Sequence, residues 1–335
     1  MKTYIVTGGG GFLGSHLCER LLLTDHARVV SVDNFSSSNG SNIPRLRRIG
    51  GSRFKNMIAD VCQKQTWDNL DFHFGNSVAG IFNLACPASP PFYQNMPIET
   101  TLTSVLGAHH ALEFATQWGC KILQTSTSEV YGDPEVHPQP ETYRGKVNCF
   151  GPRACYDEGK RAAEALFFDY QKQRNTDIRI VRIFNTYGPN MLADDGRVIS
   201  NFINQALRDK PITVYGMGTQ SRSFCYFEDL INAIMIVWRS DYKAPVNIGN
   251  PDEYTMLELA ETVIRLTGTK SVLRMQPLPI DDPTQRCPDI TVAKSLGWVG
   301  PRIGLDEGLS NTIQYFRMLQ NSTGVSNEVR LQYTG

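Results

Sequence analysis

The sequence predicts an α/β fold: a doubly wound parallel sheet followed by a smaller C-terminal α/β lobe. Two observations support this prediction. Short apolar, β-branched runs alternate with helical patterns through the first half of the chain, and a glycine-rich turn joins the first run to the first helix. Such alternation is typical of parallel sheets that carry helices on both faces. After about residue 186 the rhythm changes at the segment "YGPNMLADDGR", which marks the second lobe.

The expected elements follow the apolar periodicity along the chain. Short β-branched runs predict six strands, at 3–6, 28–32, 54–58, 78–85, 121–126 and 177–184. Apolar residues at helical spacing predict helices at 12–23, about 98–118, 152–173, 197–208, 227–239, 255–267 and 304–319. The segment 321–335 has little apolar periodicity, so we expect it to be loosely ordered.

Composition and charge exclude several classes of function. Of 335 residues, 41% are hydrophobic and 20% are charged, as in an ordinary globular protein. The formal net charge is zero and no basic run stands out, so neither nucleic acid nor a membrane is an expected partner. The eight cysteines form no CxxC pair and the six histidines show no metal-ligand spacing, which predicts reduced thiols and no metal. Because "MKTYIV" enters a strand directly and no apolar run approaches 18 residues, we expect a cytoplasmic protein.

Gly8, Gly11 and Gly14 in "TGGGGFLGSHL" have the spacing of a dinucleotide-binding turn of the Rossmann type. Glycine lets the backbone turn sharply there and approach a diphosphate closely. Asp33 ends the second predicted strand, where its carboxylate would accept hydrogen bonds from a ribose diol and repel a 2′-phosphate. The predicted cofactor is therefore NAD, with Asp60 placed near the adenine. The other residues predicted to contact NAD are Phe12, Leu13, Asn34, Val61, Leu84, Ala85, Thr103, Thr125 and Thr186.

Tyr156 and Lys160 lie in the segment "GPRACYDEGKRAAEAL", residues 151–166. Gly-Pro is a helix-start signal and apolar residues follow at helical spacing, so the two side chains are expected one turn apart on one face. Taken alone, the pair is equally well explained as an exposed aromatic–cation contact. Beside a dinucleotide-binding turn, it indicates a tyrosine base that a lysine activates, with both residues also contacting NAD.

The tyrosine needs this help because a free tyrosine, with a pKa of about 10, is only ~0.1% ionised at neutral pH. Lowering that pKa by about three units needs roughly 4 kcal/mol. The lysine ammonium and the positive charge of the nicotinamide together can supply it.

From "TGGGGFLGSH" to "GLDEGLSNTIQYF" the chain resembles the extended short-chain dehydrogenase/reductase family, which acts on nucleotide sugars. Three segments are similar to its UDP-glucuronate decarboxylases, also called UDP-xylose synthases: "QTSTSEVYGDPEVHPQPE", "NLACPASPPFYQNMP" and "DDPTQRCPDI". Thr-Ser-Glu in the first segment differs from the Thr-Asp-Glu of the family's 4,6-dehydratases. The 4-epimerases typically lack the glutamate.

The resemblance implies a decarboxylation in which C4 of the sugar is oxidised, CO₂ leaves the resulting β-keto acid, C5 is protonated and C4 is reduced again. Tyr156 and Lys160 would act on the C4 hydroxyl, and Thr127 would donate a hydrogen bond to the C4 oxygen. Ser128 and Glu129 would manage water and protons near C5. Arg286 would orient the substrate carboxylate. The residues implied in substrate binding are Pro87, Tyr93, Asn185, Arg197, Val198, Tyr215, Arg222 and Arg286.

The implied organisation is an NAD-binding Rossmann domain over 1–186, a nucleotide-sugar-binding lobe over 187–320 that interleaves with it, and the tail 321–335. The family resemblance also implies a homodimer, formed by the helices near 98–118 and 152–173 as a four-helix bundle. Three alternatives stay open at the level of sequence: another nucleotide-sugar 4-epimerase or 4,6-dehydratase, a decarboxylase that releases UDP-4-keto-pentose, and a non-catalytic NAD-binding protein.

Overall fold

The computed structural model of the chain describes residues 1–278 and 285–332. Its centre is a seven-stranded sheet of order β11-β6-β5-β4-β1-β2-β3, in which every neighbouring pair is parallel. The strands are β1 (Thr3–Thr7), β2 (Arg28–Asp33), β3 (Phe54–Ile58), β4 (Val78–Asn83), β5 (Lys121–Thr127), β6 (Ile178–Ile183) and β11 (Pro245–Ile248). The predicted fold class is confirmed, and the six predicted strands are present with ends within two residues of those expected.

Helices cover both faces of the sheet because the strand residues alternate between two apolar layers. Tyr4 and Val6 of β1 pack in one buried cluster, whereas Ile5 between them packs in the other. The first cluster is closed by helices α1 (Phe12–Thr24), α2 (Ile43–Gly50) and α9 (Phe227–Arg239). The second is closed by α3 (Lys64–Phe74), α6 (Ala108–Trp118) and α7 (Ala154–Arg174).

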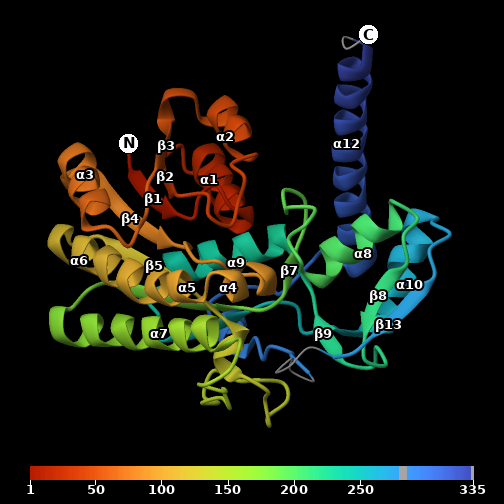
Figure 1. The fold of residues 1–335 in the computed structure, drawn as a ribbon. Helices are drawn as coiled ribbons and strands as arrows, with labels where there is room; N and C mark the ends of the chain where they lie inside the picture. Colours follow the sequence, from red (N-terminus) through yellow and green to blue (C-terminus); the bar gives the residue numbers. More distant parts are fainter. Residues whose placement is uncertain (279–284, 333–335) are drawn as a thin grey trace.

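The second lobe lies beside the carboxyl edge of the sheet, at the right of Figure 1. It is built on a third apolar cluster that includes Ile199, Phe202, Val214, Leu259 and Phe316. Its elements are α8 (Val198–Ala206), β8 (Ile212–Tyr215), β9 (Ser221–Ser223), β12 (Glu253–Thr255), α10 (Met256–Thr267), β13 (Leu273–Gln276) and α12 (Leu305–Gln332). The short strands β7 (Thr186–Tyr187) and β10 (Cys225–Tyr226) join it to the main sheet region. α9 and β11 follow residue 186 in the chain but pack with the main sheet, so the two lobes share segments of the sequence. The division near residue 186 and the loosely ordered tail stay proposals.

Several elements were not predicted from the sequence, chiefly α2, α3, β11 and the short helices α4 (Pro90–Asn95) and α11 (Thr291–Ser295). The single helix expected over 98–118 is interrupted. It consists of α5 (Pro97–Leu102), a five-residue π-helical turn at Thr103–Gly107 and α6. Such turns insert one extra residue per hydrogen-bonded ring and are frequent at functional sites. Here the turn starts at Thr103, which lines the cavity described below.

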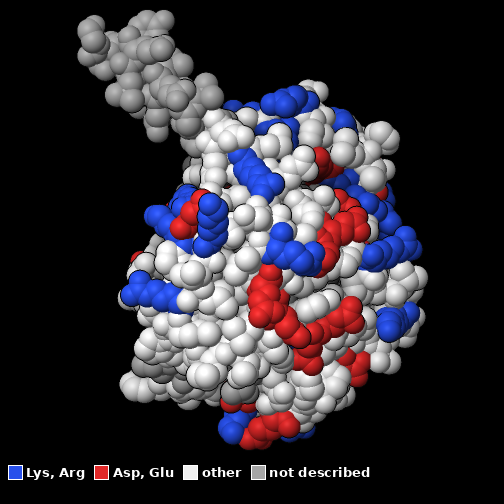
Figure 2. Space-filling view, turned by 90° about the vertical axis from the view of Figure 1, so that its right-hand side faces the viewer, with Lys and Arg blue, Asp and Glu red and all other residues white. Residues whose placement is uncertain are grey.

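The surface carries both signs of charge in neighbouring groups, as Figure 2 shows for one face. This distribution agrees with the formal net charge of zero and with the absence of a basic run in the sequence. Across the two described ranges, no helix is long and apolar enough to cross a membrane.

Candidate active site

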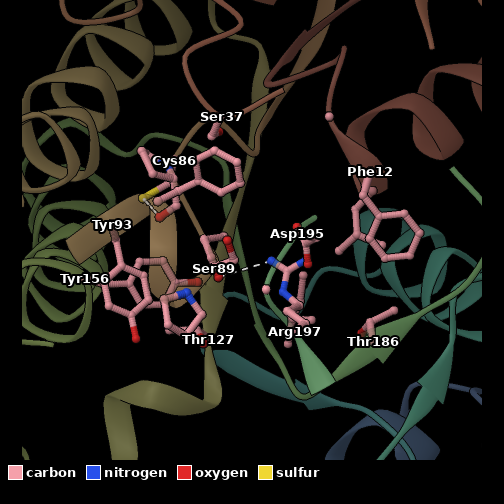
Figure 3. Close-up of a pocket in the computed structure, with 18 of the residues that line it drawn as sticks. Phe12, Ser37, Cys86, Ser89, Tyr93, Thr127, Tyr156, Thr186, Asp195 and Arg197 are labelled. Atoms are coloured by element: carbon pink, nitrogen blue, oxygen red, sulfur yellow. Dashed lines mark hydrogen bonds and ion pairs between the residues drawn. The ribbon is translucent and has the colours of Figure 1, made fainter. Parts of the chain in front are cut away.

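A cavity of about 730 Å³ opens at the carboxyl edge of the sheet, between the strand ends and the second lobe. This is where the chain order reverses around β1 and β4, the position at which doubly wound sheets bind ligands. Every residue predicted to act in catalysis, NAD binding or substrate binding lines this one cavity. Figure 3 shows several of them, with Tyr156, Tyr93 and Thr127 on one side and Phe12, Thr186 and Arg197 on the other.

The glycine-rich turn between β1 and α1 forms one end of the cavity. Gly8 has φ of +67°, which favours glycine, and a Cβ on Gly14 would collide with the carbonyl oxygen of Gly8. No side chain caps the start of α1 at Gly11, so the backbone N–H groups of the first turn are available to an anion. A close backbone cradle with an uncapped helix start fits the diphosphate of a dinucleotide.

Asp33 lies beside this cradle at the end of β2. Its carboxylate accepts hydrogen bonds from the backbone N–H groups of Gly10 and Phe35, both at 2.9 Å. Burial raises its pKa, while these hydrogen bonds oppose that shift. Each carboxylate oxygen retains further acceptor capacity. The geometry therefore fits the predicted role of Asp33 as acceptor for a ribose diol.

Replacing Asp33 by asparagine should weaken NAD binding about 10- to 100-fold, because hydrogen bonds to a charged group contribute roughly 1.5–3 kcal/mol. Preference for NAD over NADP should fall as well, because the charge that repels a 2′-phosphate is lost. Isothermal titration with each cofactor measures both effects. Asp68→Asn, at an exposed site on α3, is the matched control. Unchanged NAD affinity in Asp33→Asn would show that the Asp33 carboxylate does not bind the cofactor.

The Tyr156 and Lys160 side chains meet deeper in the cavity, on the first turns of α7. The ammonium nitrogen of Lys160 donates to the carbonyl oxygen of Thr125 at 2.9 Å and lies 5.9 Å from the centre of the Tyr156 ring. The ring of Tyr93 stacks on that of Tyr156, with centroids 5.2 Å apart and planes 7° from parallel. The predicted proximity of tyrosine and lysine is thus present in the structure.

In the chain alone, the pKa of Tyr156 lies above its ordinary value. Burial raises that pKa, and the nearby Cys86 and Glu129 add to the effect, while a hydrogen bond with Thr127 opposes it. The expectation that the lysine ammonium and the nicotinamide charge together lower this pKa stays a prediction.

Glu129 is held in the cavity by two arginines. Arg286 approaches it with both terminal nitrogens, at 2.5 and 2.8 Å, and Arg153 donates to one carboxylate oxygen at 2.5 Å. Although burial favours the neutral carboxyl, Arg286 and then Arg153 outweigh it and hold the pKa of Glu129 at about 2. Glu129 is therefore ionised at neutral pH. Arg286, predicted to bind the substrate carboxylate, here binds the carboxylate of Glu129 in the same bidentate manner.

Sequence reasoning missed Arg153 and its neighbour Asp157. Both are buried, and the Nε of Arg153 lies 3.8 Å from a carboxylate oxygen of Asp157. Within the described part of the chain, the other oxygen, Oδ1, is buried without a hydrogen-bond partner. Burial, followed by the negative charge of Glu129, raises the pKa of Asp157 to about 7. The signal for this pair in the sequence is the i, i+4 spacing of Arg153 and Asp157, which places opposite charges one helical turn apart beside Tyr156.

Asp157 should make the stability of the fold fall with rising pH. Its folded pKa, about 7, lies above its ordinary value of 3.8, so the folded state retains a proton that the unfolded state has lost. This contribution is complete below about pH 4 and disappears as pH rises through 7. The free energy of unfolding of Asp157→Asn should therefore exceed that of wild type by about 1–3 kcal/mol at pH 8, and the two should be about equal at pH 4. Urea unfolding at both pH values measures this, with the exposed Asp169→Asn on the same helix as control; no difference at pH 8 would contradict it.

The remaining predicted substrate contacts occupy the far wall. Arg197 precedes α8, donates to the carbonyl oxygen of Ala88 at 3.1 Å and lies 3.2 Å from the carboxylate of Asp195. Arg222, in β9, is buried and close enough to Glu129 to lower its pKa. Tyr215, at the end of β8, is 44% exposed, which places it at the rim. The walls thus offer arginines toward the centre and an aromatic ring at the mouth.

These features define a dinucleotide-dependent enzyme class built on a Tyr/Lys pair. The chain belongs to the NAD dependent epimerase/dehydratase family, whose model matches residues 4–249. It is 48% identical over 315 residues to UDP-glucuronic acid decarboxylase 5 of Arabidopsis thaliana, covering 94% of this chain and 89% of that protein. UDP-glucuronic acid decarboxylase 1 of Danio rerio is 46% identical over 94% of this chain and 72% of that protein. The family resemblance inferred from the motifs is confirmed.

The fold is shared with a UDP-glucuronic acid 4-epimerase from Bacillus cereus, solved in complex with UDP-glucuronic acid and NAD. The TM-score is 0.83 at 26% identity, over 95% of this chain and 99% of that one. A UDP-glucose 4-epimerase from Thermotoga maritima, solved with UDP-glucose, matches with a TM-score of 0.86 at 25% identity, over 95% and 99% of the two chains.

Proposed function

We propose that this chain decarboxylates UDP-glucuronate to UDP-xylose, with NAD as a cofactor recycled within each turnover. The relatives named decarboxylase, at 46–48% identity over 94% of the chain, support this reaction. One structural observation carries it: Arg286 and Arg153 hold a carboxylate, that of Glu129, in the cavity that also contains Tyr156. A site that binds a carboxylate through guanidinium groups beside a C4 base suits a sugar with a C6 carboxylate.

The glycine turn at Gly8–Gly14 and Asp33 would hold NAD, which would supply hydride transfer from C4 of the sugar and back to it. Tyr156 accepts the C4 hydroxyl proton as C4 becomes a ketone, and Thr127 donates a hydrogen bond to the same oxygen. The C5–C6 bond of the β-keto acid then breaks, its electron pair moves toward the C4 oxygen, and CO₂ leaves. A water oriented by Ser128 and Glu129 protonates C5, and the hydroxide left behind takes a proton from solvent. When C4 is reduced again, Tyr156 returns its proton to the C4 oxygen. Because Glu129 is ionised, it orients the water and does not itself supply this proton.

In the ion cluster of Glu129, Arg153 and Arg286, the substrate carboxylate can replace the carboxylate of Glu129 as the partner of Arg286. A substrate carboxylate that engages Arg286 leaves Glu129 with Arg153, which already contacts it at 2.5 Å. Glu129 therefore stays paired throughout, which avoids an uncompensated buried charge. We assign Arg153 a positioning role on this ground.

The direct test is to incubate the purified chain with UDP-glucuronate, with and without added NAD⁺, and follow the sugar by proton NMR. Formation of UDP-xylose with one equivalent of CO₂ is expected. A 4-keto product with build-up of NADH would instead make the chain a decarboxylase that releases UDP-4-keto-pentose. Formation of UDP-galacturonate without CO₂ would make it an epimerase, and absence of turnover would leave a dinucleotide-binding protein.

We propose in addition that the chain forms a homodimer through α5–α6 and α7, as a four-helix bundle, and that it works in the cytoplasm. Ile98, Leu102, Leu106 and Phe168 on these helices are between 39% and 69% exposed. Exposed apolar side chains on packed helices favour an interface. Phe168→Glu should shift the mass measured by light scattering from dimer to monomer, whereas Phe72→Glu, on the exposed face of α3, should not. A monomeric wild type would contradict the dimer.

The eight free cysteines fit a reducing compartment, which supports the proposed cytoplasmic location.

A further inference from the structure

Three side chains outside the cavity, His137, Glu253 and Cys287, bring their potential metal-ligand atoms within 4.8 Å of one another. We call them the His137 cluster. They come from three separate segments: the loop before α7, the first residue of β12 and the segment before α11. The Nε2 of His137 lies 2.7 Å from a carboxylate oxygen of Glu253. The Cys287 thiol donates to the carbonyl oxygen of Pro251 at 3.3 Å.

We propose that the His137 cluster binds a thiophilic divalent cation of the Zn²⁺ type. An imidazole nitrogen, a carboxylate oxygen and a thiolate are the three ligand classes that Zn²⁺ uses, and three protein ligands leave a fourth position for water. With metal–ligand bonds of about 2.0–2.3 Å, ligand atoms around a tetrahedral ion lie roughly 3.3–3.8 Å apart. The three ligand atoms lie within 4.8 Å of one another, so small side-chain movements would bring them to these separations.

The backbone around the cluster is fixed by hydrogen bonds. The buried Gln139 donates its N–H to the Cys287 carbonyl oxygen at 2.9 Å, and its side-chain oxygen accepts from the Cys287 N–H at the same distance. The second oxygen of Glu253 accepts from the Ser221 hydroxyl at 2.6 Å. Hydrogen bonds of this kind orient metal ligands before the ion arrives. The cluster therefore has a supporting shell as well as donors.

The local charge favours a divalent cation. The carboxylates of Glu253, Asp252 and Asp289 lie close enough to the Cys287 thiol to act on it electrostatically. The same carboxylates attract a divalent ion. On binding, the S–H bond breaks, the proton leaves to solvent and a sulfur–metal bond forms. Occupancy would also restrain the backbone next to Arg286, which precedes Cys287 in the chain.

Cobalt titration of the full chain tests the site without relying on enzymatic turnover. One equivalent of Co²⁺ should produce visible ligand-field bands and a near-ultraviolet thiolate-to-cobalt charge-transfer band, and Zn²⁺ should displace both. Cys287→Ser should abolish the charge-transfer band, whereas Cys149→Ser, at an exposed cysteine outside the cluster, should retain it. His137→Ala should lower Co²⁺ affinity by at least about tenfold.

Because His137 is exposed, its alanine variant is expected to fold even if Cys287→Ser does not, and circular dichroism checks both. The proposal fails if the wild type shows no charge-transfer band. It fails equally if the band and the affinity are unchanged in folded His137→Ala.

Discussion

Tyr156→Phe is expected to lower turnover of UDP-glucuronate by about 10²–10⁴-fold, the usual contribution of a positioned general base. The loss follows because the C4 hydroxyl proton has no acceptor once the phenolic oxygen is gone. Phenylalanine keeps the ring that stacks on Tyr93 at 5.2 Å, so the wall of the cavity is retained. NAD affinity, measured by titration, should stay within a few-fold of wild type, and neither CO₂ nor a 4-keto sugar should form at the wild-type rate.

Tyr170→Phe on the same helix is the matched control, because the hydroxyl of Tyr170 contacts His109 and lies outside the cavity. It should turn over at nearly the wild-type rate. If Tyr156→Phe keeps more than a tenth of wild-type turnover while Tyr170→Phe behaves alike, another group must accept the C4 proton, and the assignment of Tyr156 is wrong.

Local spacing made the cofactor end and the Tyr/Lys pair predictable from sequence. Gly8, Gly11 and Gly14 are close in the chain and their role depends on one turn, so a short motif carries the information. Tyr156 and Lys160 are likewise brought together by a single helical turn. The sheet was predictable for the same reason, since its strands alternate with helices along the chain. Its seventh strand, β11, is four residues long and gave no periodic signal.

Long-range contacts were not predictable in this way. Arg286 binds Glu129, which lies 157 positions away in the sequence. The motif around Arg286 predicted that this arginine binds a substrate carboxylate, but it could not show that a glutamate of the chain itself occupies the arginine. The stacking of Tyr93 on Tyr156 depends on how α4 packs against α7. The pKa of Tyr156 depends on burial, which spacing does not measure. The sequence therefore indicated which residues share a cavity, but not how their charges are balanced within it.

Removing the charge of Glu129 should destabilise the fold strongly. Glu129→Gln leaves Arg286 and Arg153 buried without their shared carboxylate, and breaking a buried pair from one side costs about 3–5 kcal/mol. The folded pKa of Glu129, about 2, lies below its ordinary value of 4.5. Its contribution is therefore complete above about pH 4.5 and is lost as pH falls toward 2. Chemical unfolding at pH 7 and pH 4 should show the larger deficit at pH 7.

The double variant Glu129→Gln/Arg286→Gln separates the fold from the reaction. It removes one negative and one positive charge, so it should recover about 1–3 kcal/mol relative to the sum of the single variants. Turnover should not recover, because Arg286 is needed for the substrate carboxylate and Glu129 for the water at C5. Recovery of stability without turnover is the expected result. If turnover returned together with stability, the two residues would serve only to brace the cavity, and Arg153 would be left as the cation for the substrate carboxylate.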